Sequence, residues 1–191
     1  MITRRAFTTG LAALPLAACG TAPEKRAIAS PAEVAELSRT VQAMGPDVSP
    51  DEAAAAAQIA YDTTRQLAIQ YQITDPPLIH NTKVNLGLRP RGLCWHWAED
   101  LERRLDAEGF GTLEMHRAIA VGRGVRIDHS TAIISAKGDA YGEGVVLDPW
   151  RRGGELFFAP VVEDTRYFWE KRELVLARRS AANEEEAGLR Q

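Results

Sequence analysis

The sequence predicts an α+β domain in which N-terminal helices and a central cysteine-bearing helix pack on an antiparallel β-sheet. Helix-start signals and helical spacing of apolar residues fill the first half of the chain, whereas β-branched segments separated by glycine turns fill much of the second half. The length of 191 residues and the 45% hydrophobic content suit a single buried core. We therefore expect one domain over residues 31–178.

Two helix starts use the same signal, a serine followed by proline and, three residues on, by glutamate. Ser30 and Ser49 each provide the N-cap hydroxyl of such a capping box. The predicted helices cover residues 31–44 and 50–72. Apolar and small residues recur on one face of the second helix: Ala56, Ala60, Thr64, Leu67 and Tyr71.

A central helix is predicted from about Arg91 to Gly109, where glycine ends it. The prolines at residues 76–77 end the preceding helix and open a predicted loop that runs to about Pro90. One face of the central helix carries Cys94, Ala98, Leu101 and Leu105. This spacing directs the thiol toward the sheet.

Four segments rich in β-branched and apolar residues predict the sheet, and each is bounded by a turn that contains glycine. They span residues 112–121, 128–136, 144–148 and 155–162. Residues 167–178 form a closing helix or strand in this prediction, and residues 179–191 form a polar tail.

Charge and composition exclude several classes of protein. The formal charge of −3 argues against nucleic acid as the main partner, because phosphate binding normally requires a basic surface. The sequence contains no run of 18 apolar residues, so it predicts no membrane-spanning helix. We expect no cofactor.

Residues 1–18 have the basic start and the apolar stretch of a signal peptide, which is too short to span a bilayer. Residues 16–19 (Leu-Ala-Ala-Cys) resemble the bacterial lipobox, and the pair Arg4 and Arg5 resembles a twin-arginine export signal. An unprocessed helix packed into the domain is the alternative. The lipobox resemblance implies that Cys19 is lipidated and that residues 19–30 are a tether.

A diacylglycerol on Cys19 carries two acyl chains, which suffice for stable anchoring. The resemblance therefore implies a lipoprotein of the bacterial cell envelope, whose partner is the lipid bilayer. The domain would face the periplasm or the exterior. Gly20 is not an acidic retention signal, so the outer membrane is favoured in a host that has one.

Three residues in the second half have the types and order of a nucleophilic site. Cys94 lies in the first turn of its predicted helix, where the partial positive charge of the N-terminus favours a thiolate. His129 heads a predicted strand and can act as a base, and Asp148 ends the next strand and can orient the imidazole.

This order resembles the transglutaminase-like superfamily of the papain-like clan over residues 86–158. The matching motifs are Gly-Leu-Cys-Trp at residues 92–95, His129 at a strand start and Leu-Asp-Pro at residues 147–149. The chain departs from the family pattern in having Thr131 two positions after the histidine, and in a short spacing between Cys94 and His129. The resemblance implies a papain-like core.

The resemblance further implies that Cys94 is the acyl-accepting nucleophile, His129 the general base and then acid, and Asp148 the residue that fixes the histidine tautomer. Asn85 is the candidate for a second oxyanion donor, and Trp95 is the candidate wall of the substrate groove. The implied reaction acts on a peptide or amide through a thioester. Hydrolase and acyl transferase remain open.

Other interpretations of the same residues remain open. Cys94 can be an inert core residue, and a disulfide with Cys19 is excluded only if Cys19 is lipidated. Zinc could be held by a ligand set of Cys94, His96, His129 and Asp148. The competing class of function is a non-catalytic envelope protein that uses this fold for binding or assembly.

Two arginines follow Asp148 directly. Arg151 and Arg152 can receive a substrate carboxylate, but a solvated turn is the simpler interpretation of both.

Overall fold

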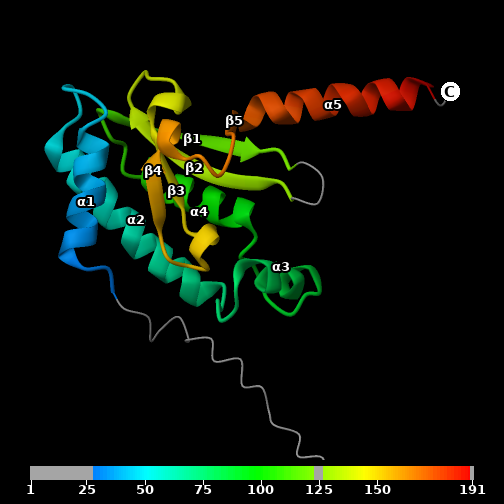
Figure 1. The fold of residues 1–191 in the computed structure, drawn as a ribbon, viewed down its shortest axis with the longest axis horizontal. Coiled ribbons are helices and arrows are strands. Elements are labelled where there is room, and N and C mark those ends of the chain that lie inside the picture. Colours follow the sequence, from blue (N-terminus) through cyan, green and yellow to red (C-terminus); the bar gives the residue numbers. More distant parts are fainter. Residues whose placement is uncertain (1–27, 123–126, 190–191) are drawn as a thin grey trace, which may run out of the picture.

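The computed structural model of the chain describes residues 28–122 and 127–189 (Figure 1). The signal peptide and Cys19 lie outside the described residues. The helices are α1 (Pro31–Gln42), α2 (Pro50–Gln70), α3 (Pro77–Asn85), α4 (Cys94–Asp106) and α5 (Arg172–Leu189). The strands are β1 (Leu113–Ala120), β2 (His129–Ala136), β3 (Val145–Asp148), β4 (Phe157–Pro160) and β5 (Glu170–Lys171).

The five strands form one sheet in the order β4-β3-β2-β1-β5, with every neighbouring pair antiparallel. The predicted α+β class with an antiparallel sheet is therefore confirmed. Each of the four predicted strand segments contains one of β1 to β4. The segment expected to be a closing helix or strand contains both, since β5 pairs with Ala118 and Ile119 and α5 follows it directly.

The two faces of the sheet pack against different parts of the chain. Ala132 and Ile134 of β2 point into a cluster that includes buried residues of α1, α2 and α4. Ile133, which lies between them, packs on the opposite face with Trp169. This alternation is the two-residue period of a strand that is buried on both faces.

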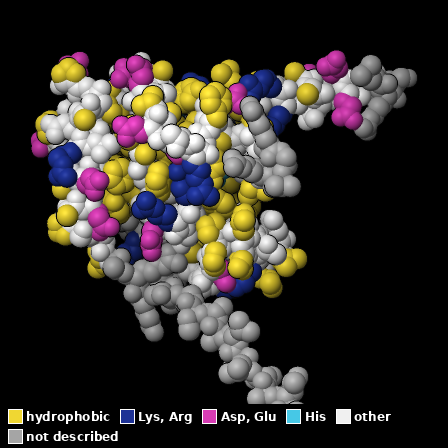
Figure 2. All heavy atoms as spheres, in the orientation of Figure 1, with side chains coloured by type: hydrophobic (Ala, Val, Ile, Leu, Met, Phe, Trp, Pro, Cys, Tyr) yellow, Lys and Arg dark blue, Asp and Glu magenta, His cyan; other side chains and the backbone are white. Residues whose placement is uncertain are grey.

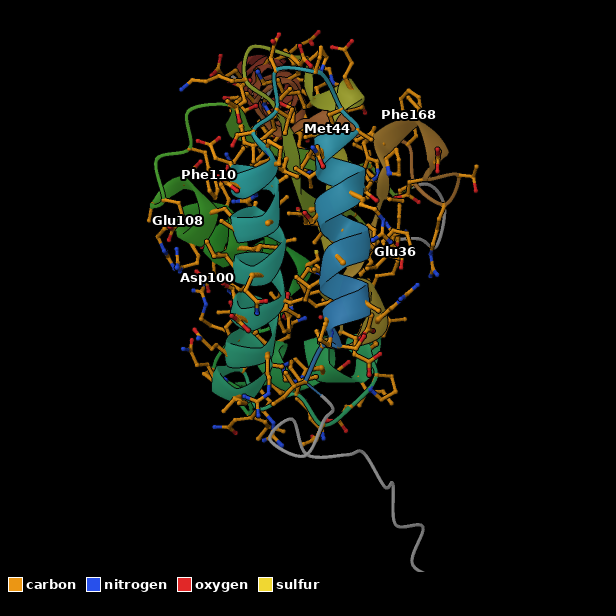
Figure 3. The ribbon with its side chains drawn as sticks, turned by 90° about the vertical axis from the view of Figure 1, so that its left-hand side faces the viewer. Glu36, Met44, Asp100, Glu108, Phe110 and Phe168 are labelled. Carbon is orange, nitrogen blue, oxygen red and sulfur yellow. The ribbon has the colours of Figure 1, made fainter. Side chains whose placement is uncertain are left out.

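Helices α1 and α2 lie side by side over the helical face of the sheet (Figure 3). The predicted stripe of α2 is buried at every position: Ala56, Ala60, Thr64, Leu67 and Tyr71. Helix α4 packs against α2 on one side and against β2 and β1 on the other. The C-terminal end of α2 packs against the start of α4, where Leu67 and Ala68 contact the cluster that contains Cys94.

The capping box of α1 is confirmed, since Ser30 Oγ accepts from Glu33 N–H and Glu33 accepts from Ser30 N–H at 2.7 Å. The second box forms only in part. Ser49 caps α2, but the Glu52 carboxylate accepts instead from the N–H groups of Gly111 and Thr112, at 2.7 and 2.8 Å. Glu52 therefore ties the start of α2 to the start of β1.

Two segments differ from the prediction in secondary structure. Residues 77–85 form α3 rather than a loop, because Pro77 occupies the first helical turn, where its missing N–H costs nothing. The closing helix α5 also continues beyond residue 178 into the polar segment, to Leu189.

Helices α3 and α5 leave much of their surface uncovered. In α3 only His80 is buried, and Figure 2 shows hydrophobic side chains gathered over this helix; the exposed ones in and beside it are Leu78, Ile79, Leu86 and Leu88. Helix α5 projects from the body of the molecule, and Val175 is the one buried side chain described in it (Figure 1). No helix in the described ranges is both long and apolar enough to cross a bilayer.

Candidate active site

Cys94 lies in the first turn of α4, as predicted, although the helix begins at Cys94 itself and not near Arg91; the residue is buried, with 8% of its surface exposed. The chain enters the helix through Gly92, whose φ of +121° is unfavourable for any residue with a side chain. A Cβ at this position would lie 2.4 Å from His80 Nε2. Glycine is therefore required for the chain to place the thiol here.

The start of α4 is capped by a histidine rather than by a hydroxyl. Nδ1 of His96 accepts from the N–H groups of Gly92 and Leu93, at 3.1 and 3.2 Å. Burial, followed by the nearby charge of Arg91, lowers the pKa of His96 to about 4, against the opposing effect of Asp100. The imidazole is consequently neutral at physiological pH, which keeps Nδ1 available as the acceptor.

His129 and Asp148 meet because β2 begins where the antiparallel β3 ends. Nε2 of His129 donates to Asp148 Oδ2 at 2.6 Å. Both side chains are almost completely buried, with 1% and 2% of their residue surfaces exposed. A short bond between two buried groups fixes both the ring orientation and the tautomer.

Electrostatics keep the imidazole of His129 strongly basic. Burial alone lowers its pKa, but the charge and the hydrogen bond of Asp148 raise the pKa, and contact with Cys94 raises it further. The net result is a pKa of about 9. For Asp148, burial acts to raise the pKa, yet His129 and Arg151 together hold it below its ordinary value.

The thiol lies beside the free end of this imidazole. Cys94 Sγ is 4.0 Å from the carbonyl oxygen of Asp128, the residue that precedes His129. Nδ1 of His129 is buried, and the group that acts on the imidazole besides Asp148 is Cys94. The structure thus brings together Cys94, His129 and Asp148, which are distant in sequence, with Nδ1 left for the thiol.

Three aromatic side chains enclose the imidazole of His129. The ring centroids of Trp150, Tyr167 and Trp169 lie 4.7, 4.6 and 5.5 Å from its own. Trp150 also packs in the cluster that contains Cys94. This enclosure excludes water from the bond between His129 and Asp148.

Arg151 extends the site in a way that the sequence analysis missed. Its Nε donates to Asp148 Oδ2 at 2.9 Å, and its two terminal nitrogens donate to the carboxylate of Asp164 at 3.0 and 2.6 Å. The expectation of a solvated turn is wrong for Arg151, which is 6% exposed in its side chain, whereas Arg152 is exposed. Arg151 faces the interior and its donors are engaged, so it does not receive a substrate carboxylate.

The two weaker candidates of the sequence analysis are not drawn into this cluster. Asn85 is exposed at the last position of α3, and its side chain forms no hydrogen bond with the described residues. Trp95 is 45% exposed and packs against His96 with its ring tilted by 48°, the ring centroids lying 3.8 Å apart. The polar side chain of α3 that does reach the site is Asn81, which accepts from Trp150 Nε1 at 3.0 Å.

The four candidate zinc ligands do not form one cluster. Among the residues that the structure describes, no three His, Cys, Asp or Glu side chains are placed to hold a metal ion. His96 contributes to the cap of α4, and the Nε2 of His129 is bonded to Asp148.

Comparison of the chain with protein-family models, with curated proteins and with solved structures finds no match. The chemistry of the site must therefore be derived from its geometry. That geometry offers a thiol at a helix N-terminus, a basic imidazole with one free nitrogen, and a buried carboxylate that holds the other nitrogen.

Proposed function

We propose that this chain is a thiol hydrolase or acyl transferase that acts on a peptide or amide, with Cys94 as nucleophile, His129 as base and acid, and Asp148 as the group that orients His129. The observation that supports this most is the 2.6 Å bond between two buried residues, His129 and Asp148. It leaves the free nitrogen of a basic imidazole beside Cys94. The transglutaminase-like resemblance and its papain-like core belong to the same proposal.

The first half of the reaction forms a thioester. Because the pKa of His129 is about 9, the proton of the thiol already resides on Nδ1 of His129 at neutral pH, and the resulting Cys94 thiolate attacks the carbonyl carbon of the substrate. The carbonyl oxygen gains the negative charge, which the Cys94 N–H can stabilise, because an N–H at the first helical position has no intrahelical acceptor. The imidazolium then gives its proton to the leaving amine as the C–N bond breaks.

The second half releases the acyl group. Water or an acceptor amine attacks the thioester while Nδ1 of His129 takes its proton, and the proton returns to the thiolate as the C–S bond breaks. Asp148 stays ionised throughout and stabilises the imidazolium. Whether water or an amine is the acceptor defines hydrolase or transferase.

Alkylation of Cys94 by iodoacetamide tests this proposal without a known substrate. In the full chain carrying Cys19→Ser, Cys94 is the one remaining cysteine. We expect alkylation to stay rapid at pH 6.5 and to slow at least about tenfold in His129→Gln, because the ion pair is lost. His116→Gln, which alters a half-buried imidazole of β1 outside the site, is the matched control.

A thiol that reacts equally in the parent and in His129→Gln would contradict the catalytic proposal. Because such a chain would retain the fold, that result would favour a non-catalytic envelope protein that uses it for binding or assembly. Screening of amide and ester substrates is warranted only after the thiol has passed this test.

The proposal includes a lipid anchor on Cys19, which the lipobox sequence supports. The tether then begins at Cys19 and leads to α1 at Pro31. In a bacterial host, radiolabelled palmitate should be incorporated into the wild-type chain and not into Cys19→Ser, and the variant should leave the membrane fraction. Retention of the label in Cys19→Ser would contradict the anchor while leaving the proposal for Cys94 untouched.

A further inference from the structure

Asp148 is held by more than the imidazole. Its Oδ2 accepts from both His129 Nε2 and Arg151 Nε, at 2.6 and 2.9 Å, and its Oδ1 accepts from the backbone N–H of Arg151 at 3.1 Å. Because both oxygens are engaged, the carboxylate cannot rotate without breaking a bond to Arg151. The orientation of His129 is thus fixed indirectly by Arg151.

Arg151 is itself fixed from the opposite side. The carboxylate of Asp164 binds its two terminal nitrogens in a bidentate pair. Its guanidinium carbon lies 3.9 Å from the ring centroid of Phe157 and 4.8 Å from that of Tyr167. The guanidinium is therefore held by two carboxylates and two aromatic rings, a geometry that lysine cannot reproduce in full.

Asp164 completes the network. Its oxygens also accept from Trp169 Nε1 at 2.9 Å and from the Arg166 N–H at 3.3 Å. Trp169 also links Asp164 to the site, because its ring packs on that of His129. The network therefore closes on the imidazole.

The charges in this network alternate. The ionisable groups that act on Asp148 are His129 and Arg151, and the ionisable group that acts on Asp164 is Arg151. Trp169 and the backbone N–H of Arg166 add neutral hydrogen bonds to Asp164. Without Arg151, the buried carboxylate of Asp148 would face the imidazolium with its charge no longer shared with a guanidinium. Such an imidazolium would hold its proton too tightly to serve as a general acid.

We propose that Arg151 is a positioning residue with two effects on the pair. It holds Asp148 in the plane of its bond to His129, and it weakens the effect by which the charge of Asp148 makes His129 retain its proton. Its importance for catalysis rests on the proposed function. Its effect on the His129–Asp148 pair does not, so the two ideas can fail separately.

The test is the pKa of His129, measured by NMR titration of its ring protons in the full chain carrying Cys19→Ser and Cys94→Ala. Removing the thiol decouples the imidazole from a second titrating group. His129 is identified as the resonance that His129→Gln removes. The variants compared are Arg151→Met, Arg151→Lys and, as a matched control from the same turn, Arg152→Met.

In Arg151→Met we expect the proton affinity of His129 to rise at least about tenfold, which is one pKa unit. Arg151→Lys keeps the charge, so the pKa of His129 should rise much less than in Arg151→Met. The lysine should not, however, hold the ring of His129 in a single conformation. Arg152→Met should leave the titration of His129 unchanged, because Arg152 contacts the face of Phe157 at the surface and neither carboxylate of the network.

A folded Arg151→Met variant with an unchanged His129 titration would overturn the inference. If Arg151→Met does not fold, the double variant Arg151→Met/Asp164→Asn removes the buried pair together, and the same rise is expected there. In parallel, the alkylation rate of Cys94 in the Cys19→Ser chain reports on the proposed function. An inert thiol with a raised His129 pKa in Arg151→Met would refute the catalytic proposal and leave this inference standing.

Discussion

The pH dependence of unfolding should report directly on the His129–Asp148 pair. The pKa of His129 is about 9 in the folded chain and close to 6.5 when the chain is unfolded. Because the folded state binds this proton more tightly, the stabilisation is complete below pH 6.5 and disappears as the pH rises through 9. At about 1.4 kcal/mol for each pH unit, the free energy of unfolding should fall by about 3 kcal/mol over this interval.

The other three histidines do not contribute to this fall. Burial, the largest effect at each site, lowers the pKa values of His80, His96 and His116. A group whose folded pKa is lowered destabilises the fold only below its unfolded pKa, here near 6.5. The decrease above pH 6.5 is therefore specific to His129 among the imidazoles.

The measurement is urea unfolding at intervals from pH 6 to pH 9.5, in the full chain carrying Cys19→Ser and Cys94→Ala so that no thiol titrates. Loss of the contact with the Cys94 sulfur makes the expected fall somewhat smaller, about 2 to 3 kcal/mol. Asp148→Asn should flatten the profile above pH 6.5, whereas His116→Gln should leave it as it is. A flat profile in the parent, or an undiminished fall in Asp148→Asn, would refute the account of the pair.

Three further outcomes follow from the packing. Gly92→Ala should lower the free energy of unfolding by about 2 kcal/mol or more, because its Cβ meets a buried imidazole in a strained backbone, whereas Gly45→Ala, with open space around it, should not. Glu52→Gln should cost about 1 kcal/mol in urea unfolding by weakening the bonds to the start of β1, and Asp51→Asn, on the exposed side of the same turn, is its control. Ending the chain after Ser180 should leave the unfolding midpoint unchanged, since the residues removed are exposed wherever they are described, and a clear drop would show that they contribute to the fold.

The sequence predicted the elements whose signals are local. The serine caps, the helical spacing in α2 and the β-branched strands each specify their own structure, and the structure places them as expected. The approach of His129 to Asp148 was also predictable, because neighbouring antiparallel strands bring the start of one to the end of the other. Their roles in a reaction stay a prediction.

Features that depend on contacts distant in sequence were not predictable. The prolines before Leu78 indicate the end of one helix, but nothing local shows that the buried ring of His80 anchors a second helix after them. Arg151 follows a turn and would ordinarily be solvated. Its burial requires Asp164, whose position is set by the later segment around Trp169. Glu52 departs from the capping box for the same reason, since Thr112 offers donors that α2 alone does not have.

The aromatic enclosure of His129 leaves both ring nitrogens buried but gives them different neighbours. At Nε2 the hydrogen is held between a buried carboxylate and packed rings, so its replacement by deuterium must await a local opening of the structure. At Nδ1 the ring faces the thiol instead. Proton transfer to and from the imidazole therefore takes place at Nδ1. The rate of hydrogen–deuterium exchange at Nε2 measures how often this part of the molecule opens.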